Sequence, residues 1–145
     1  AFLTEVQPDA DVRAFLQRSL GYAATGEPNR KTFWFFYGPG GNNGKTTFLE
    51  AAQGALGEYA MQAQPETFMV RKGADSGLNN DIARLKGQRL VLVPETDDGQ
   101  RLNEGQMKRI TGGDTITARF MRQEFFEFKP TFAIFMSGNH RPTIR

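Results

Sequence analysis

The sequence predicts an α/β fold in which a parallel sheet is flanked by helices, and three observations support this prediction. Residues 32–37, 89–93 and 132–136 are short apolar or aromatic runs of the kind that forms buried strands. Residues 10–20, 44–56 and 103–110 are expected to form helices. A glycine-rich stretch, GPGGNNGKTT, lies between the first strand and the helix that follows it. Strand, glycine-rich loop and helix in this order are typical of a phosphate-binding site.

The composition is that of one globular domain. At 145 residues the chain can bury a core, and 23% charged residues argue against a membrane span and a disordered tail. The first residues carry acids and no long apolar run, so neither an export signal nor a membrane partner is expected. The lack of cysteine excludes disulfides and cysteine-based zinc sites. A net charge of +2 does not by itself indicate a nucleic-acid partner.

The chain is expected to divide into an N-terminal helical segment, residues 1–28, and a core, residues 29–145. The N-terminal helix is expected to follow Pro8 and Asp9 and to end at Gly21. Residues 25–31 have turn composition and lead into the first strand. Because the sequence starts on Ala and stops without a closing element, the core is expected to be truncated at its C-terminus.

The remaining segments are less regular. A short strand is expected near residues 59–64, and residues 71–81 have the composition of a polar loop. Two strand-like pieces, residues 115–120 and 124–129, flank a polar turn at Arg122 and Gln123. This pattern predicts an inserted β-hairpin.

The glycine-rich stretch is the strongest chemical signal. Closely spaced glycines let backbone N–H groups converge on phosphate oxygens, and the helix N-terminus adds a favourable dipole. In a Walker A loop of this kind, Lys45 reaches the β- and γ-phosphates of ATP and the Thr46 hydroxyl binds Mg²⁺. The sequence therefore predicts a P-loop NTPase. The expected nucleotide-binding residues are Gly38, Pro39, Gly40, Gly41, Asn42, Asn43, Gly44, Lys45, Thr46 and Thr47.

The loop departs from the usual pattern in its length. Five residues separate Gly38 from Gly44, which is one more than usual, and an extra glycine can absorb the difference because it accepts unusual backbone angles. A flexible surface turn is the alternative interpretation. Such turns seldom separate an aromatic strand from a helix that begins with GKTT.

Glu95 is the candidate Walker B acid, because it follows the strand predicted at residues 89–93. A carboxylate there can bind Mg²⁺ or polarise the attacking water. A typical Walker B strand ends in two adjacent acids, whereas Pro94 and Thr96 flank Glu95, so both roles stay open. A surface carboxylate after a core strand is a third interpretation, and Asp97 and Asp98 are secondary candidates.

Asn139 follows the strand predicted at residues 132–136. Its amide can hydrogen-bond both the γ-phosphate and a water, which would let it sense the bound nucleotide. A strand-terminal Asn is more often a turn residue. Its position after the other two motifs gives it weight, and Lys45, Glu95 and Asn139 form the candidate catalytic set.

The segment between Glu95 and Asn139 is locally basic. Its candidate DNA-binding residues are Lys108, Arg119, Arg122 and Gln123, and contacts to phosphates would give sequence-independent, salt-sensitive binding to single-stranded DNA. An ordinary solvated hairpin explains the charge equally well. Phe126 and Phe128 are expected to belong to the core rather than to a base-stacking surface.

With these elements in order, the sequence resembles the superfamily III helicases, specifically the phage and plasmid primase-helicase family related to the poxvirus primase-helicase. The resemblance rests on FFYGPGGNNGKTTFLE, RLKGQRLVLVPET, KRITGGDTITARFMRQEFFEFKP and FAIFMSGNHRP, which follow the family's order of motifs A, B, B-prime and C. It covers most of the chain. The ordered set is more specific than the glycine-rich loop alone.

The resemblance implies an AAA+-like parallel sheet, a homo-hexameric ring and a hairpin that projects into a DNA channel. By this analogy Lys45 and Thr46 bind nucleotide and Mg²⁺, Glu95 is the Walker B acid and Asn139 the sensor. The implied function is an ATPase that drives a DNA helicase in phage or plasmid replication. Its implied location is the cytoplasm of a bacterial host or a viral replication site.

The family also uses an arginine finger from the neighbouring subunit, usually downstream of the motif that ends at Asn139. Arg141 and Arg145 are poor substitutes, so residues 1–145 alone are expected to hydrolyse ATP weakly. A nucleic-acid-binding or assembly module with a decayed NTPase site is an alternative. A P-loop ATPase that acts on a different partner is another.

Overall fold

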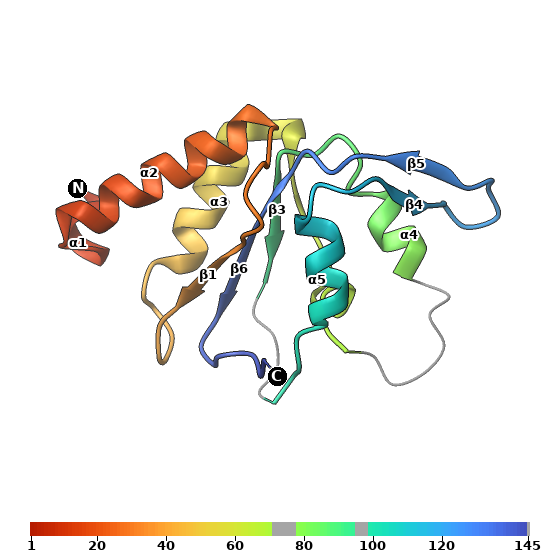
Figure 1. The fold of residues 1–145 in the computed structure, drawn as a ribbon. Coiled ribbons are helices and arrows are strands. Elements are labelled where there is room, and N and C mark those ends of the chain that lie inside the picture. The colour runs from red at the N-terminus through yellow and green to blue at the C-terminus, as the bar shows by residue number, and fades with distance from the viewer. Residues whose placement is uncertain (71–77, 95–98, 145) are drawn as a thin grey trace.

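The computed structural model describes residues 1–70, 78–94 and 99–144, and these form a parallel sheet with helices on both faces (Figure 1). The strand order is β1-β6-β3-β2, and every neighbouring pair is parallel. The strands are β1 (Trp34–Tyr37), β2 (Ala60–Gln62), β3 (Leu90–Val93) and β6 (Ala133–Gly138). The predicted α/β fold with a helix-flanked parallel sheet is confirmed.

The central strands β3 and β6 are buried on both faces, as parallel strands between helices usually are. In β3, Leu90 and Leu92 belong to one core cluster, whereas Val91 and Val93 belong to the cluster on the opposite face. Successive side chains of a strand point to opposite faces, so the continuous apolar run RLVLV supplies both clusters. Phe135 of β6 is fully buried at the centre of the sheet and packs against the Trp34 and Phe36 rings.

Two helices cover one face, and a short helix precedes them. These are α1 (Phe2–Val6), α2 (Ala10–Thr25) and α3 (Lys45–Leu56). Asp9 caps α2 by accepting hydrogen bonds from the N–H groups of the first turn. Ala23 of α2 packs in the same cluster as Phe48 and Leu49 of α3. The division of the chain at residue 28 stays a prediction.

The expected end of the first helix was wrong. The helix continues through Gly21 to Thr25, and Gly26 ends it with a left-handed φ of 70°. An interior glycine costs a helix only about 1 kcal/mol relative to alanine, which the packing of Ala23 can offset. The left-handed position after the last turn is where glycine is most favoured.

The opposite face carries α4 (Leu78–Ala83), α5 (Glu104–Thr111) and the hairpin of β4 (Ile116–Ala118) and β5 (Phe126–Phe128). The predicted polar loop at 71–81 was wrong over its second half, because α4 begins at Leu78. Ile82 and Ala83 of α4 are almost fully buried, so tertiary packing stabilises a helix that its polar sequence does not favour. Residues 71–77 lie outside the described residues.

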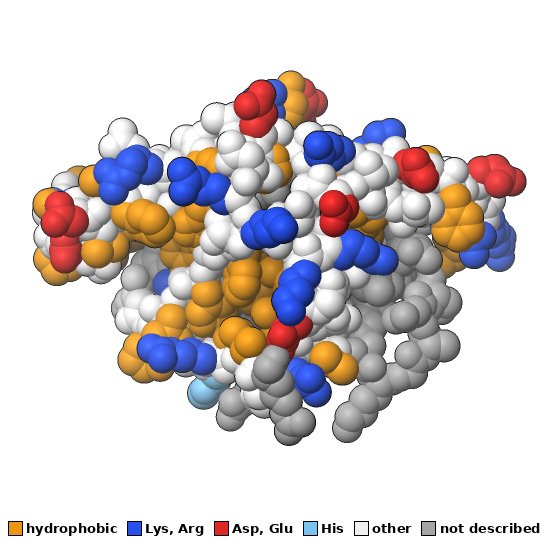
Figure 2. Space-filling model, in the orientation of Figure 1, with side chains coloured by type: hydrophobic (Ala, Val, Ile, Leu, Met, Phe, Trp, Pro, Cys, Tyr) orange, Lys and Arg blue, Asp and Glu red, His pale blue; other side chains and the backbone are white. Residues whose placement is uncertain are grey.

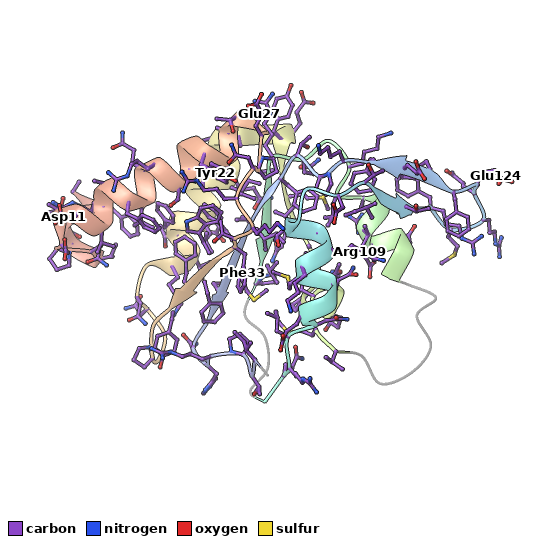
Figure 3. The ribbon with its side chains drawn as sticks, in the orientation of Figure 1. Asp11, Tyr22, Glu27, Phe33, Arg109 and Glu124 are labelled. Atoms are coloured by element: carbon purple, nitrogen blue, oxygen red, sulfur yellow. The ribbon has the colours of Figure 1, made fainter. Side chains whose placement is uncertain are left out.

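Two short 3₁₀ helices, η1 (Gly57–Tyr59) and η2 (Pro65–Thr67), lie on either side of β2. Phe33, just before β1, packs into the cluster that α5 and the hairpin share (Figure 3). Among the helices of the described ranges, none is long and apolar enough to cross a membrane.

Candidate functional site

The glycine-rich stretch forms the loop between β1 and α3, at the carboxyl edge of the sheet (Figure 1). Because β1, β6 and β3 are parallel neighbours, their carboxyl ends meet at this same edge. In open α/β sheets, ligands bind outside the carboxyl ends of the strands. The predicted nucleotide-binding residues therefore lie where a ligand site is expected.

The backbone of this loop is tightly turned. Gly40, Asn42 and Gly44 have positive φ values of 72°, 63° and 76°. The Asn43 amide donates hydrogen bonds to the carbonyls of Pro39 and Gly40, at 3.2 and 3.0 Å, and so closes the loop from inside. Three residues with left-handed backbone at alternate positions therefore turn the chain sharply between β1 and α3.

Lys45, the first residue of α3, connects the loop to the neighbouring strand. Its Nζ donates to the Gly38 carbonyl at 3.0 Å and to Asn139 Oδ1 at 2.7 Å, across 94 residues of sequence in the second case. A Cβ on Gly38 would lie 2.8 Å from Asn43 Nδ2 and 3.3 Å from Lys45 Nζ, so glycine there leaves room for both side chains. The two bonds use two of the three ammonium donors.

The N-terminus of α3 is suited to an anion. Gly44 is the N-cap residue and provides no side-chain hydrogen bond, so no side-chain cap occupies the N–H groups of the first turn. Thr46 and Thr47 lie in this turn and are exposed. Unpaired N–H groups and the helix dipole favour a phosphate at such a position.

The third predicted catalytic residue, Glu95, follows β3 in the sequence. β3 ends at Val93 and is followed by the half-buried Pro94. Glu95, together with Asp97 and Asp98, lies outside the described residues. The structure therefore brings together Lys45 and Asn139, and β3 reaches the same edge beside β6.

Two further features adjoin the loop. Tyr37 is the residue immediately before Gly38. The Arg141 guanidinium lies 4.7 Å from the centroid of the Tyr37 ring. Val6 and Phe2 of α1 pack against Gly44, where a Cβ would lie 2.7 Å from Val6 Cγ1. The contact between α1 and the loop could not be predicted, because nothing in the composition of residues 2–6 indicates which surface they meet.

A cavity of about 730 Å³ extends from the loop between α1, α2 and β1. Its walls are mainly apolar and aromatic, and Gln7, Asn43 and Lys45 contribute polar side chains. Ligand sites commonly combine such walls with a few polar groups and have volumes of roughly 300–1,000 Å³. The lining residues include Leu3, Val6, Val12, Phe15, Leu16, Trp34, Phe36, Tyr37 and Phe48.

The predicted DNA-binding residues separate into two places. Arg119, Arg122 and Gln123 lie on the hairpin, where Arg122 has a positive φ of 61° at the turn and Gln123 N–H donates to the Phe120 carbonyl. Lys108 lies on α5 and pairs with Glu104 at 4.0 Å, with 81% of the lysine side chain exposed. The expectation that Phe126 and Phe128 pack on the core is confirmed.

The chain belongs to the DUF5906 family, described as a family of unknown function, whose profile matches residues 36–145. This range includes the second half of β1, the glycine-rich loop, the hairpin and β6.

Three viral proteins are similar over almost the whole chain. "Putative helicase L207/L206" of Acanthamoeba polyphaga mimivirus is 32% identical over 144 residues, and "Putative helicase 022R" of Frog virus 3 is 32% identical over 149 aligned positions. "Putative helicase 121R" of Invertebrate iridescent virus 3 is 24% identical over 148. The chain spans only 15–16% of the length of these relatives.

The fold is also similar to solved structures of the C-terminal region of NrS-1. An apo A form matches 96% of this chain and 31% of that one with a TM-score of 0.69 at 12% identity. A second apo form matches 94% of this chain with a TM-score of 0.63. At this identity the likeness concerns the fold alone.

Proposed function

We propose that this chain is the ATP-binding core of a DNA helicase, a P-loop NTPase with an AAA+-like sheet that couples ATP hydrolysis to translocation on single-stranded DNA. The observation that supports this most is the pair of hydrogen bonds from Lys45 to Gly38 and Asn139. They place an ammonium group at the N-terminus of α3, between the glycine-rich loop and the end of β6. The helicase names of the viral relatives agree with this class of activity.

In the proposed site, the loop N–H groups and Lys45 bind the phosphates of ATP, and the apolar cavity beside α1 and α2 accommodates the remainder of the nucleotide. Asn139 holds Lys45 in position and contacts the γ-phosphate or the attacking water. Breaking the bond to the γ-phosphate transfers negative charge to the leaving group, which the ammonium stabilises through electrostatic attraction.

The residues of the loop fit a Mg²⁺ ion because they include an exposed hydroxyl oxygen, that of Thr46. Mg²⁺ prefers oxygen ligands, and the Thr46 hydroxyl is exposed directly beside Lys45. When bound, the ion would neutralise phosphate charge. Thr46 is the proposed ligand in the described part of the chain, and Glu95 is the proposed carboxylate partner.

In the proposed function, single-stranded DNA binds to the hairpin and α5, through Lys108, Arg119, Arg122 and Gln123. ATP binds between neighbouring subunits of a homo-hexamer, so that an arginine from one subunit completes the site of the next. Because the similar proteins named above are viral, the proposed setting is genome replication in a host cytoplasm or viral replication site.

The test is ATP turnover by the full-length protein, measured with and without single-stranded DNA. Turnover that requires Mg²⁺ and rises with DNA is expected. Binding of DNA without any ATP binding would instead support the decayed-site alternative. Turnover that DNA leaves unchanged would favour an ATPase with a different partner.

A further inference from the structure

The hairpin has an inward and an outward face. Ile116 pairs with Phe128 and Ala118 with Phe126, and these four side chains pack on or in the core cluster. The alternating Thr117 and Glu127 are exposed. The ladder ends at Ala118 and Phe126, and continuing its register by one position brings Arg119 opposite Phe125 on the outward face.

Phe125 is an aromatic residue on this solvent side. It is 55% exposed, although the two other phenylalanines of the segment EFFEF pack on the core. The Arg119 guanidinium lies 4.5 Å from the centroid of its ring. Met121, in the adjoining turn, is 71% exposed. The core therefore does not account for the presence of Phe125.

The end of the hairpin is anchored to the rest of the molecule. The Met121 N–H donates to Asn80 Oδ1 of α4 at 3.2 Å, and the Lys86 ammonium lies 5.0 Å from the centroid of the Phe126 ring. The Gln123 N–H donates to the Phe120 carbonyl at 3.1 Å within the turn. These contacts hold the residues on both sides of Phe125, and such pre-organisation of the hairpin lowers the entropic cost of binding.

We propose that Phe125 is a stacking platform for one base of a single-stranded nucleic acid, with Arg119 holding the ring from one side and Arg122 near the phosphates. This inference rests on the proposed function and adds a base contact to its phosphate contacts. Every base has a π-face, so such a contact is tolerant of sequence.

The size and charge of the surface favour a nucleic acid over a protein partner. The surface of two exposed apolar side chains, Phe125 and Met121, is far smaller than the roughly 1,200–2,000 Å² that a stable protein interface buries. Figure 2 shows apolar, basic and acidic side chains together at the end of the hairpin, and Figure 3 places Glu124 there. Since Glu124 and Glu127 offset part of the arginine charge, phosphate attraction alone is weak, and the ring supplies the additional contact.

The experiment measures binding by the full-length protein to a fluorescent oligothymidylate and to an abasic strand of equal length. The wild type is expected to prefer oligothymidylate. Phe125→Ala should weaken binding to oligothymidylate by roughly 10- to 100-fold and change binding to the abasic strand little. Phe125→Trp should retain the preference, whereas Phe125→Leu should lose it. Ile144→Ala, which removes an exposed apolar side chain elsewhere, is the control.

Three results would overturn the inference. They are unchanged binding by Phe125→Ala, an equal loss on both strands, and wild-type behaviour of Phe125→Leu, because the last two indicate a packing role. If Arg122→Ala still weakens binding in those cases, the proposed function survives without the stacking contact. If the wild type binds neither strand, both proposals fail.

Discussion

At the scale of single residues, Lys45 connects two parts of the sequence that are far apart. Its hydrogen bonds to Gly38 and Asn139 orient the ammonium group at the N-terminus of α3. A group held in place loses less conformational freedom when the phosphates arrive. This arrangement gives separate expectations for the lysine and for the asparagine.

Replacing Lys45 with Ala should weaken ATP binding by roughly 100-fold or more, since each hydrogen bond to a charged group is worth about 1.5–3 kcal/mol. The fold should persist, because the side chain is only partly buried. Binding of a fluorescent ATP analogue, with Lys31→Ala as the exposed-lysine control, measures the effect. Wild-type affinity in Lys45→Ala would refute the phosphate-loop assignment.

Asn139→Ala should reduce ATP turnover by about 100-fold while ATP affinity changes only a few-fold, because one oriented polar group typically contributes this much to a transition state. Lys45 would lose the acceptor at 2.7 Å but keep the Gly38 carbonyl. Steady-state turnover and equilibrium binding of ATP separate the two effects. A larger loss of binding than of turnover would contradict the sensor role.

At the scale of elements, α2 shows why helix boundaries are hard to predict. Gly21 and Gly26 look alike in sequence, but only Gly26 has a positive φ, and Arg89 fixes the end of the helix by donating to the Ala24 carbonyl at 2.6 Å. This contact joins the last turn of the helix to a residue 65 positions later in the chain, which local sequence patterns do not indicate.

The two glycines give opposite predictions for stability. Gly21→Ala should stabilise the fold by about 0.5–1 kcal/mol, because a Cβ there meets nothing within 4 Å and alanine favours the helix. Gly26→Ala should destabilise it by about 1–2 kcal/mol, because φ is 70° and the Cβ would lie 3.3 Å from Arg89 Nε. Denaturant unfolding of both variants tests the pair, and the same sign for both would contradict the observed helix end.

Other elements could be predicted because their signals are local. The strands and α3 follow from apolar runs and spacing, and the hairpin from two strand-like pieces around a turn. The helix α4 could not, since its sequence is polar and its formation depends on burying Ile82 and Ala83. The exposure of Phe125 follows from alternation only once the pairing of Ala118 with Phe126 fixes the register.

At the scale of the whole molecule, the glycine-rich loop and the end of the hairpin are separate. The loop lies at the carboxyl edge below β1, whereas the hairpin projects from the opposite side of the sheet, beyond α4 and α5 (Figure 1). Within one chain, the proposed ATP and DNA sites are therefore linked through the sheet and the helices that lie between them. The sequence order of the motifs predicted both sites but gave no information on this separation.

This separation leads to a prediction for Arg122→Ala in the full-length protein. Binding to single-stranded DNA and the DNA-stimulated part of ATP turnover should fall, while turnover without DNA stays near the wild-type value, because the exposed turn is remote from Lys45. The slope of log affinity against log salt should decrease by about 0.7 for one lost phosphate contact, equally for DNA of different sequences. Lys129→Ala, at an exposed position beyond the base of β5, should have a smaller effect. An unchanged salt slope in Arg122→Ala would mean that DNA binds elsewhere, and a loss of turnover without DNA would mean that the hairpin supports the nucleotide site directly.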